Sequence, residues 1–171
     1  MSFLTEQHWN PVKIILTHGH SDHIAGIPTL KKHFPDVTVS IGVKDADMLT
    51  DPMKNLSAML GLNVKPGPAD ELLKEGDIIT FYDVELEVVE TPGHTAGGLS
   101  FLNKKDKVAL TGDSLFAGSI GRTDFPDGNY NQLIKSIKEK LMVLPGDTSI
   151  HPGHGMASTI AQEAAGNQYL I

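Results

Sequence analysis

The sequence contains no cysteine, so disulfide bonds and thiolate metal ligands are both excluded. Any metal site in this chain must therefore be built from histidine and carboxylate side chains. Positive charge is also scarce, because 14 Lys and Arg stand against 21 Asp and Glu, a formal net charge of −7. Since no basic cluster offers the footprint that nucleic acid phosphates require, we expect no nucleic acid partner.

Long apolar runs are lacking as well. No stretch approaches the roughly 20 residues of a membrane span, and residues 1–8 lack the basic start and apolar run of a signal peptide. We therefore expect no membrane association and a cytoplasmic location. The 171 residues, 40% of them hydrophobic and 20% charged, have the composition of an ordinary globular protein, so we predict one domain over residues 1–171.

The segment of residues 17–23 concentrates more metal-ligand chemistry than any other part of the chain. Directly after the apolar run at residues 14–16 come four ligand-type side chains: His18, His20, Asp22 and His23. Imidazole nitrogens and a carboxylate oxygen suit a divalent ion, whereas a buried core tolerates so many polar groups badly. The segment therefore predicts a metal site at the end of a strand.

Three more ligand-type side chains each follow a predicted strand: His94 after residues 84–89, Asp113 after residues 108–110 and His154 after residues 149–151. Loops that leave a sheet at one common edge can bring such residues together. Seven ligands are too many for one zinc, so we expect two divalent ions. His18, His20 and His94 would bind one ion, Asp22, His23 and His154 the other, and Asp113 would bridge both.

The remaining pattern alternates short strands and helices. We predict further strands at residues 12–16, 37–41, 78–81 and 99–102, with hairpins joining 78–81 to 84–89 and 99–102 to 108–110. Helices are predicted from Ser21 or Asp22 to Pro35, over residues 45–49, 55–60, 130–141 and 159–165. His8, His33 and His151 fall outside the predicted metal site.

The series His-x-His-x-Asp-His, then single His, Asp and His in this order, resembles the metallo-β-lactamase fold superfamily. Residues 112–124 and 152–155 resemble its glyoxalase II-like hydrolases. This resemblance implies an α/β (α+β) protein, a four-layer αββα sandwich, with a dinuclear metal centre that usually holds zinc and sometimes iron or manganese.

The resemblance also implies an activity, which is thioester hydrolysis of the hydroxyacylglutathione type by a metal-bound hydroxide on a small-molecule substrate. Two cations would lower the pKa of a shared water and polarise the thioester carbonyl. By the same resemblance, Asp22 orients the hydroxide in addition to binding metal. Arg122 and Asp124 either contact the substrate or hold their loop through an ion pair.

Two features depart from the family pattern. Members begin with several strands before the first ligand loop, whereas only residues 1–11 precede the first predicted strand here. We therefore expect part of the N-terminal sheet to be missing, with an exposed sheet edge through which copies of the chain could associate. The helical domain that binds glutathione in full glyoxalase II has no counterpart, so that specificity is not carried over.

Three other functions stay open. Residues 121–125 are similar to persulfide dioxygenases, which use one iron held by two His and one Asp, although the intact second set of Asp22, His23 and His154 favours two metals. An incomplete chain that binds metal with little activity is a third reading. Phosphodiester hydrolysis is a fourth, and the acidic charge balance disfavours it.

Overall fold

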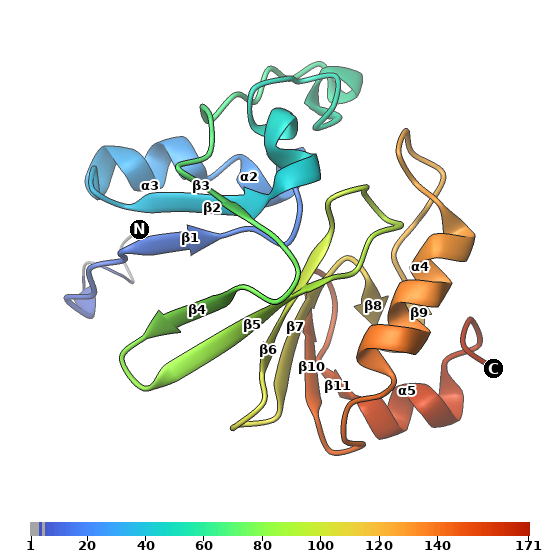
Figure 1. The fold of residues 1–171 in the computed structure, drawn as a ribbon. Helices are drawn as coiled ribbons and strands as arrows, with labels where there is room; N and C mark the ends of the chain where they lie inside the picture. Colours follow the sequence, from blue (N-terminus) through green and yellow to red (C-terminus); the bar gives the residue numbers. More distant parts are fainter. Residues whose placement is uncertain (1–3, 5) are drawn as a thin grey trace.

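The computed structural model describes residue 4 and residues 6–171. Four layers are stacked in Figure 1: a helical layer, a three-stranded sheet, a six-stranded sheet and a second helical layer. This is the αββα sandwich that the sequence predicts. Both faces of each sheet are covered by a neighbouring layer, and each gap between layers is filled by its own apolar cluster.

The three-stranded sheet is parallel and has the order β1-β2-β3. Its strands are β1 (Lys13–Ile15), β2 (Thr38–Gly42) and β3 (Glu71–Leu73). Parallel strands need crossover connections, and helices supply both of them. The first crossover contains α2 (Ser21–Ile24) and α3 (Ile27–His33), and the second contains the 3₁₀ helices η1 (Val43–Leu49) and η2 (Ser57–Leu60).

The six-stranded sheet has the order β11-β10-β7-β6-β5-β4. Its strands are β4 (Ile78–Phe81), β5 (Val84–Glu90), β6 (Leu99–Asn103), β7 (Val108–Gly112), β10 (Ser149–Pro152) and β11 (Ser158–Thr159). β10 runs parallel to β7, and β5 runs in the same direction because one antiparallel strand, β6, separates it from β7. The loops after β5, β7 and β10 therefore leave the sheet at the same end, where the carboxyl ends of these three strands lie.

Three further elements complete the second helical layer and its border. They are the hairpin of β8 (Leu115–Phe116) and β9 (Ser119–Ile120), the helix α4 (Tyr130–Ser136), which continues as the π-helical turn η3 (Ile137–Leu141), and α5 (Ile160–Gly166). Leu133, Ile137 and Leu141 are fully buried against Ile150 of β10. This side of the amphipathic pattern is the one that the sequence places in the core.

Most predicted elements are confirmed, including both hairpins and the helix over residues 130–141. The single helix predicted from Ser21 or Asp22 to Pro35 is wrong, because α2 ends at Ile24 and α3 begins at Ile27. Pro28 has no N–H to donate to the carbonyl of Ile24, so the helical hydrogen bonds cannot continue through this point. The strands β3, β8, β9 and β11 lie where the sequence predicted no strand.

β1 lies at one edge of the three-stranded sheet, and β4 lies at one edge of the six-stranded sheet. Ile78 on β4 and Val12 next to β1 are more than half exposed. Self-association through such an edge stays a prediction, which light scattering would test. Among the described residues, no helix is long and apolar enough to cross a membrane.

Candidate metal centre

The seven predicted ligands meet at the end of the six-stranded sheet where the carboxyl ends of β5, β7 and β10 lie and their loops leave. Two groups stand out, and in each the ligand-type atoms lie within 4.8 Å of one another. We name His18, His20 and His94 the three-histidine group, and Asp22, His23 and His154 the mixed group. Their composition matches the two predicted sets, while the binding role of each residue stays a prediction.

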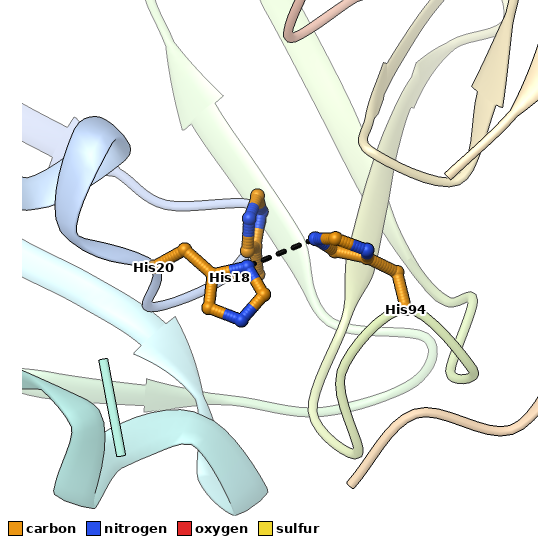
Figure 2. A group of neighbouring side chains, drawn as sticks. All are labelled: His18, His20 and His94. Carbon is orange, nitrogen blue, oxygen red and sulfur yellow. Dashed lines mark hydrogen bonds between the residues drawn. The ribbon is translucent and has the colours of Figure 1, made fainter. Parts of the chain in front are cut away.

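The three-histidine group is buried, with residue exposures of 2% for His18, 5% for His20 and 5% for His94. Figure 2 shows the three imidazoles turned toward one another, with Nδ1 of His20 2.9 Å from Nε2 of His94. Nδ1 of His94 donates to the carbonyl oxygen of Arg122 at 2.7 Å. This bond fixes the His94 tautomer and leaves the Nε2 lone pair facing the other two rings.

The mixed group is open to solvent. The side chains of Asp22 and His154 are 57% and 56% exposed, while that of His23 is 16% exposed. Nε2 of His154 lies 3.1 Å from Oδ2 of Asp22 and 3.2 Å from Nε2 of His23. Three ligand-type atoms therefore converge at a place that water and a substrate can reach.

Asp113 lies between the two groups. Its Oδ2 is 3.6 Å from Nε2 of His94 and 3.7 Å from Nε2 of His154, and its Oδ1 is 3.5 Å from Nε2 of His23. His18, His23 and Asp113 also form a third set with ligand-type atoms within 4.8 Å, which the sequence did not predict. The carboxylate is thus placed as a bridging ligand would be.

Burial and neighbouring charges separate the histidine pKa values. Burial lowers the pKa of His18 well below its usual value, and burial together with the charge of His94 lowers the pKa of His20 to about 4. For His23, burial alone would lower the pKa, but the nearby carboxylates of Asp113 and Asp22 outweigh it and raise the pKa. The imidazoles of His18 and His20 are therefore neutral at neutral pH, as metal ligation requires.

A divalent ion fits these residues. Nε2 of His18 and Oδ1 of Asp113 are buried side-chain atoms without a hydrogen-bond partner in the described part of the chain. Buried polar atoms normally have a hydrogen-bond partner. Two unpartnered atoms that face the same cluster therefore need an explanation, and ligation of a cation supplies it. Imidazole and carboxylate donors without thiolate suit zinc, iron and manganese alike.

A buried carboxylate, Asp45, ties two ligand loops together. Its Oδ2 accepts hydrogen bonds from Oγ1 of Thr95 at 2.7 Å and N of Gly19 at 3.3 Å, and its Oδ1 accepts from N of Gly97 at 2.6 Å. Burial raises the pKa of Asp45, although the three hydrogen bonds oppose this. Sequence reasoning missed this residue, because nothing in the pattern of residues 45–49 separates it from the exposed Asp47.

A cavity of about 620 Å³ opens over the metal centre. His20, His94, Asp22, Asp113 and His154 contribute to its floor. Six apolar side chains make up most of the remaining lining, namely Leu56, Met59, Leu60, Phe116, Ile120 and Phe125, together with the polar residues Ser21, Asn55, Ser119 and Arg122. No local pattern of the sequence marks an exposed apolar residue as part of a cavity wall, so this lining follows from the tertiary structure.

Arg122 and Asp124 pair with each other. Nε and Nη2 of Arg122 donate to the two carboxylate oxygens of Asp124 at 2.8 and 2.7 Å, and the guanidinium lies 3.8 Å above the ring of Phe125. Both side chains are more than half exposed, and the hydrogen bond from Arg122 lowers the pKa of Asp124 to about 2. This is the ion pair that the sequence left open, and only Arg122 lines the cavity.

The αββα layers, with two ligand groups where the loops leave the ends of the strands, are the arrangement of a metal-dependent hydrolase. A profile of the metallo-beta-lactamase superfamily matches residues 4–154, so the chain belongs to this superfamily. The site is therefore that of a metal-dependent hydrolase family whose fold implies divalent metal ions.

Similar proteins agree with this assignment. The Hydroxyacylglutathione hydrolase GloC of Haemophilus influenzae is 40% identical over 159 residues, covering 92% of this chain and 74% of that protein. The crystal structure of the BLEG-1 B3 metallo-beta-lactamase matches with a TM-score of 0.93 at 36% identity, over 99% of this chain and 81% of that one. TTHA1623, solved in a di-iron-bound form, matches with a TM-score of 0.86 at 30% identity, over 99% of this chain and 82% of that one.

Proposed function

We propose that this chain hydrolyses small-molecule thioesters in a reaction of the hydroxyacylglutathione hydrolase type. The observation that carries the proposal is the pair of ligand groups joined by Asp113 on the floor of a cavity large enough for a small substrate. The name of the similar protein GloC adds support. We further propose two ions per chain, with zinc in both groups and iron or manganese as substitutes.

Bound divalent ions supply Lewis acidity and lower the pKa of a water molecule to near neutrality. The chain's own residues hold the reactants. Asp22 lines the cavity and is half exposed, so its carboxylate can accept a hydrogen bond from the attacking water and orient it toward the carbonyl carbon. Water adds at that carbon, the carbon–sulfur bond breaks, and the products are a carboxylate and a thiol.

Elemental analysis combined with a thiol-release assay tests this function. Purified protein should contain about two zinc ions per chain, the number that a two-metal site holds, and should release free thiol from S-lactoylglutathione or another thioester. Asp22→Asn should lower kcat about 100-fold, whereas His33→Ala, an exposed histidine bonded to its own helix, should change nothing.

Three results would contradict the proposal. Two bound ions without turnover of any thioester would remove the hydrolase assignment to this substrate class. One iron per chain with oxygen consumption on glutathione persulfide would favour the dioxygenase. Protein without metal and without activity would favour the incomplete chain.

A further inference from the structure

The cavity over the metal centre has two apolar walls. One wall comes from η2 and the residue before it, namely Leu56, Met59 and Leu60, and the other comes from Phe116, Ile120 and Phe125. Met59 and Leu60 are 57% and 70% exposed. Large apolar side chains that stay exposed beside a reactive centre indicate a surface that a ligand covers.

The wall formed by Phe116, Ile120 and Phe125 stands directly beside the metal ligands. The ring of Phe125 lies edge-on to that of His20 with 5.8 Å between centroids, and the ring of Phe116 lies 6.4 Å from that of His154. A substrate whose carbonyl sits at the metal centre would therefore place the atoms next to that carbonyl against apolar side chains.

The wall of η2 is held in place by buried hydrogen bonds. Leu56 has a φ of 67°, a left-handed conformation that costs a non-glycine residue about 1–2 kcal/mol. The neighbouring Asn55 is fully buried, and its Nδ2 donates to the carbonyls of Met48 at 2.7 Å and Val64 at 2.8 Å. The carbonyl of Asn55 accepts from N of Ser21 at 2.9 Å, which joins this wall to the metal loop.

The opposite wall is fixed from α5. Oε2 of Glu163 accepts a hydrogen bond from N of Gly118 at 2.8 Å, and Nδ2 of Asn167 donates to the carbonyl of Ser119 at 3.0 Å. Glu163 is 3% exposed and Asn167 is fully buried, so these bonds anchor the β8–β9 hairpin that carries Phe116. The two walls thus form a preorganised apolar slot.

The residues that line the cavity offer little positive charge to an anionic thiol such as glutathione, which carries two carboxylates. Among the described residues that line the cavity, Arg122 is the one lysine or arginine, and its guanidinium is already paired with Asp124 and stacked on Phe125. Recognition of carboxylates normally uses guanidinium groups that are free to form paired hydrogen bonds. The cavity provides apolar contact in place of such pairing.

We propose that the enzyme selects thioesters whose group next to the carbonyl is uncharged and apolar, over hydroxyacyl thioesters of glutathione. The inference rests on the proposed thioesterase function and specifies its substrate class. The apolar group belongs to the acyl part or to the thiol part of the substrate, and either would fill the slot between Met59 and Phe116.

Four substrates show whether the acyl part or the thiol part supplies the apolar group. They are the lactoyl and hexanoyl thioesters of glutathione and of N-acetylcysteamine, a small neutral thiol. The zinc-loaded enzyme should show its highest kcat/KM with hexanoyl-N-acetylcysteamine, roughly 10-fold or more above S-lactoylglutathione. The two mixed substrates show which part fills the slot. An equal or higher kcat/KM for S-lactoylglutathione would overturn the inference and leave the thioesterase function intact.

Matched variants test the wall itself. Met59→Glu should raise KM for the hexanoyl substrate roughly 10-fold with little change in kcat. Met53→Glu is the control, because Met53 is 62% exposed in the same segment but does not line the cavity. If both variants behave alike, the wall of η2 does not bind the substrate.

A binding measurement keeps the inference testable without turnover. The zinc-loaded protein should bind the thioether S-hexyl-N-acetylcysteamine more tightly than S-hexylglutathione in titration calorimetry, and Met59→Glu should weaken that binding. If no thioester is cleaved, the proposed function fails, whereas this comparison still decides the preference of the cavity. Tighter binding of the glutathione thioether would overturn it.

Discussion

The three-histidine group and the mixed group differ most in their access to solvent. His18, His20 and His94 are at most 5% exposed, whereas the side chains of Asp22 and His154 are more than half exposed. The buried group can hold an ion rigidly in a place of low dielectric, and the exposed group can meet water and substrate. In the proposed two-ion site, the buried group would hold one ion firmly and the exposed group would hold the other where water and substrate reach it.

The division arises within a single loop. His18 and His20 precede α2 and are buried, with His20 in extended backbone, while Asp22 and His23 lie within the single turn of α2. The change from extended to helical backbone between them turns their side chains toward different places. His94 then completes the buried group and His154 the exposed one, from loops at the same sheet edge.

The largest expected effect comes from breaking the buried group. His94→Ala removes one of the three imidazoles of the buried group, so we expect loss of about one ion per chain and at least a 100-fold decrease in kcat/KM. His154→Ala should lower metal affinity less, because water can take the place of an exposed ligand. Metal content and kcat/KM measure both. Equal metal retention in the two variants would contradict the comparison.

A substitution at Asp45 tests whether the three-histidine group depends on the hydrogen bonds that hold its loops in place. Asp45→Ala leaves the hydrogen-bond donors of Thr95, Gly97 and Gly19 without their acceptor, which should destabilise the fold by about 2–4 kcal/mol. It should also weaken metal binding at the three-histidine group more than at the mixed group. Asp47→Ala, at an exposed position two residues on, serves as the control in urea unfolding and metal titration. Similar results for the two variants would remove the positioning role.

A substitution at Gly153 tests the mixed group, as the Asp45 variant tests the three-histidine group. A Cβ at this position would lie 2.4 Å from Oδ1 of Asp113 and 2.7 Å from Cε1 of His23. Gly153→Ala should therefore displace His23 and the shared Asp113, and it should lower the metal occupancy of the mixed group more than that of the three-histidine group, which keeps its three imidazoles. Gly26→Ala is the control, since a Cβ there meets no atom within 4 Å. Loss of both ions, measured by elemental analysis, would show that the two groups are not separable.

The smallest effect should be a difference in pH dependence. A ligand must lose its proton to bind metal, and the pKa of His23 is raised above its usual 6.5 while that of His20 is lowered to about 4. As the pH falls, protons should therefore displace metal from the mixed group first. Metal content after dialysis at steps from about pH 8 to about pH 4 should fall in two stages. A single stage would contradict the comparison.

The sequence by itself indicated a metal-ligand cluster and determined much of the local structure. The ligand types, their order and their positions after strands identify seven residues, because metal-ligand side chains and strand patterns are local features of the chain. Alternating apolar residues also determined the two hairpins, and helical spacing determined the helix over residues 130–141. The break between α2 and α3 was missed, although Pro28 carries the signal for it.

Only the tertiary structure decided which ligands are buried, what supports them and what covers them. His20 meets His94 across 74 residues of sequence, and His23 meets His154 across 131. Asp45 looks like Asp47 until folding buries it against residues 50 and 52 positions away. The apolar slot likewise joins η2 to the β8–β9 hairpin, and no local pattern predicts such contacts, because burial depends on which distant segments pack together.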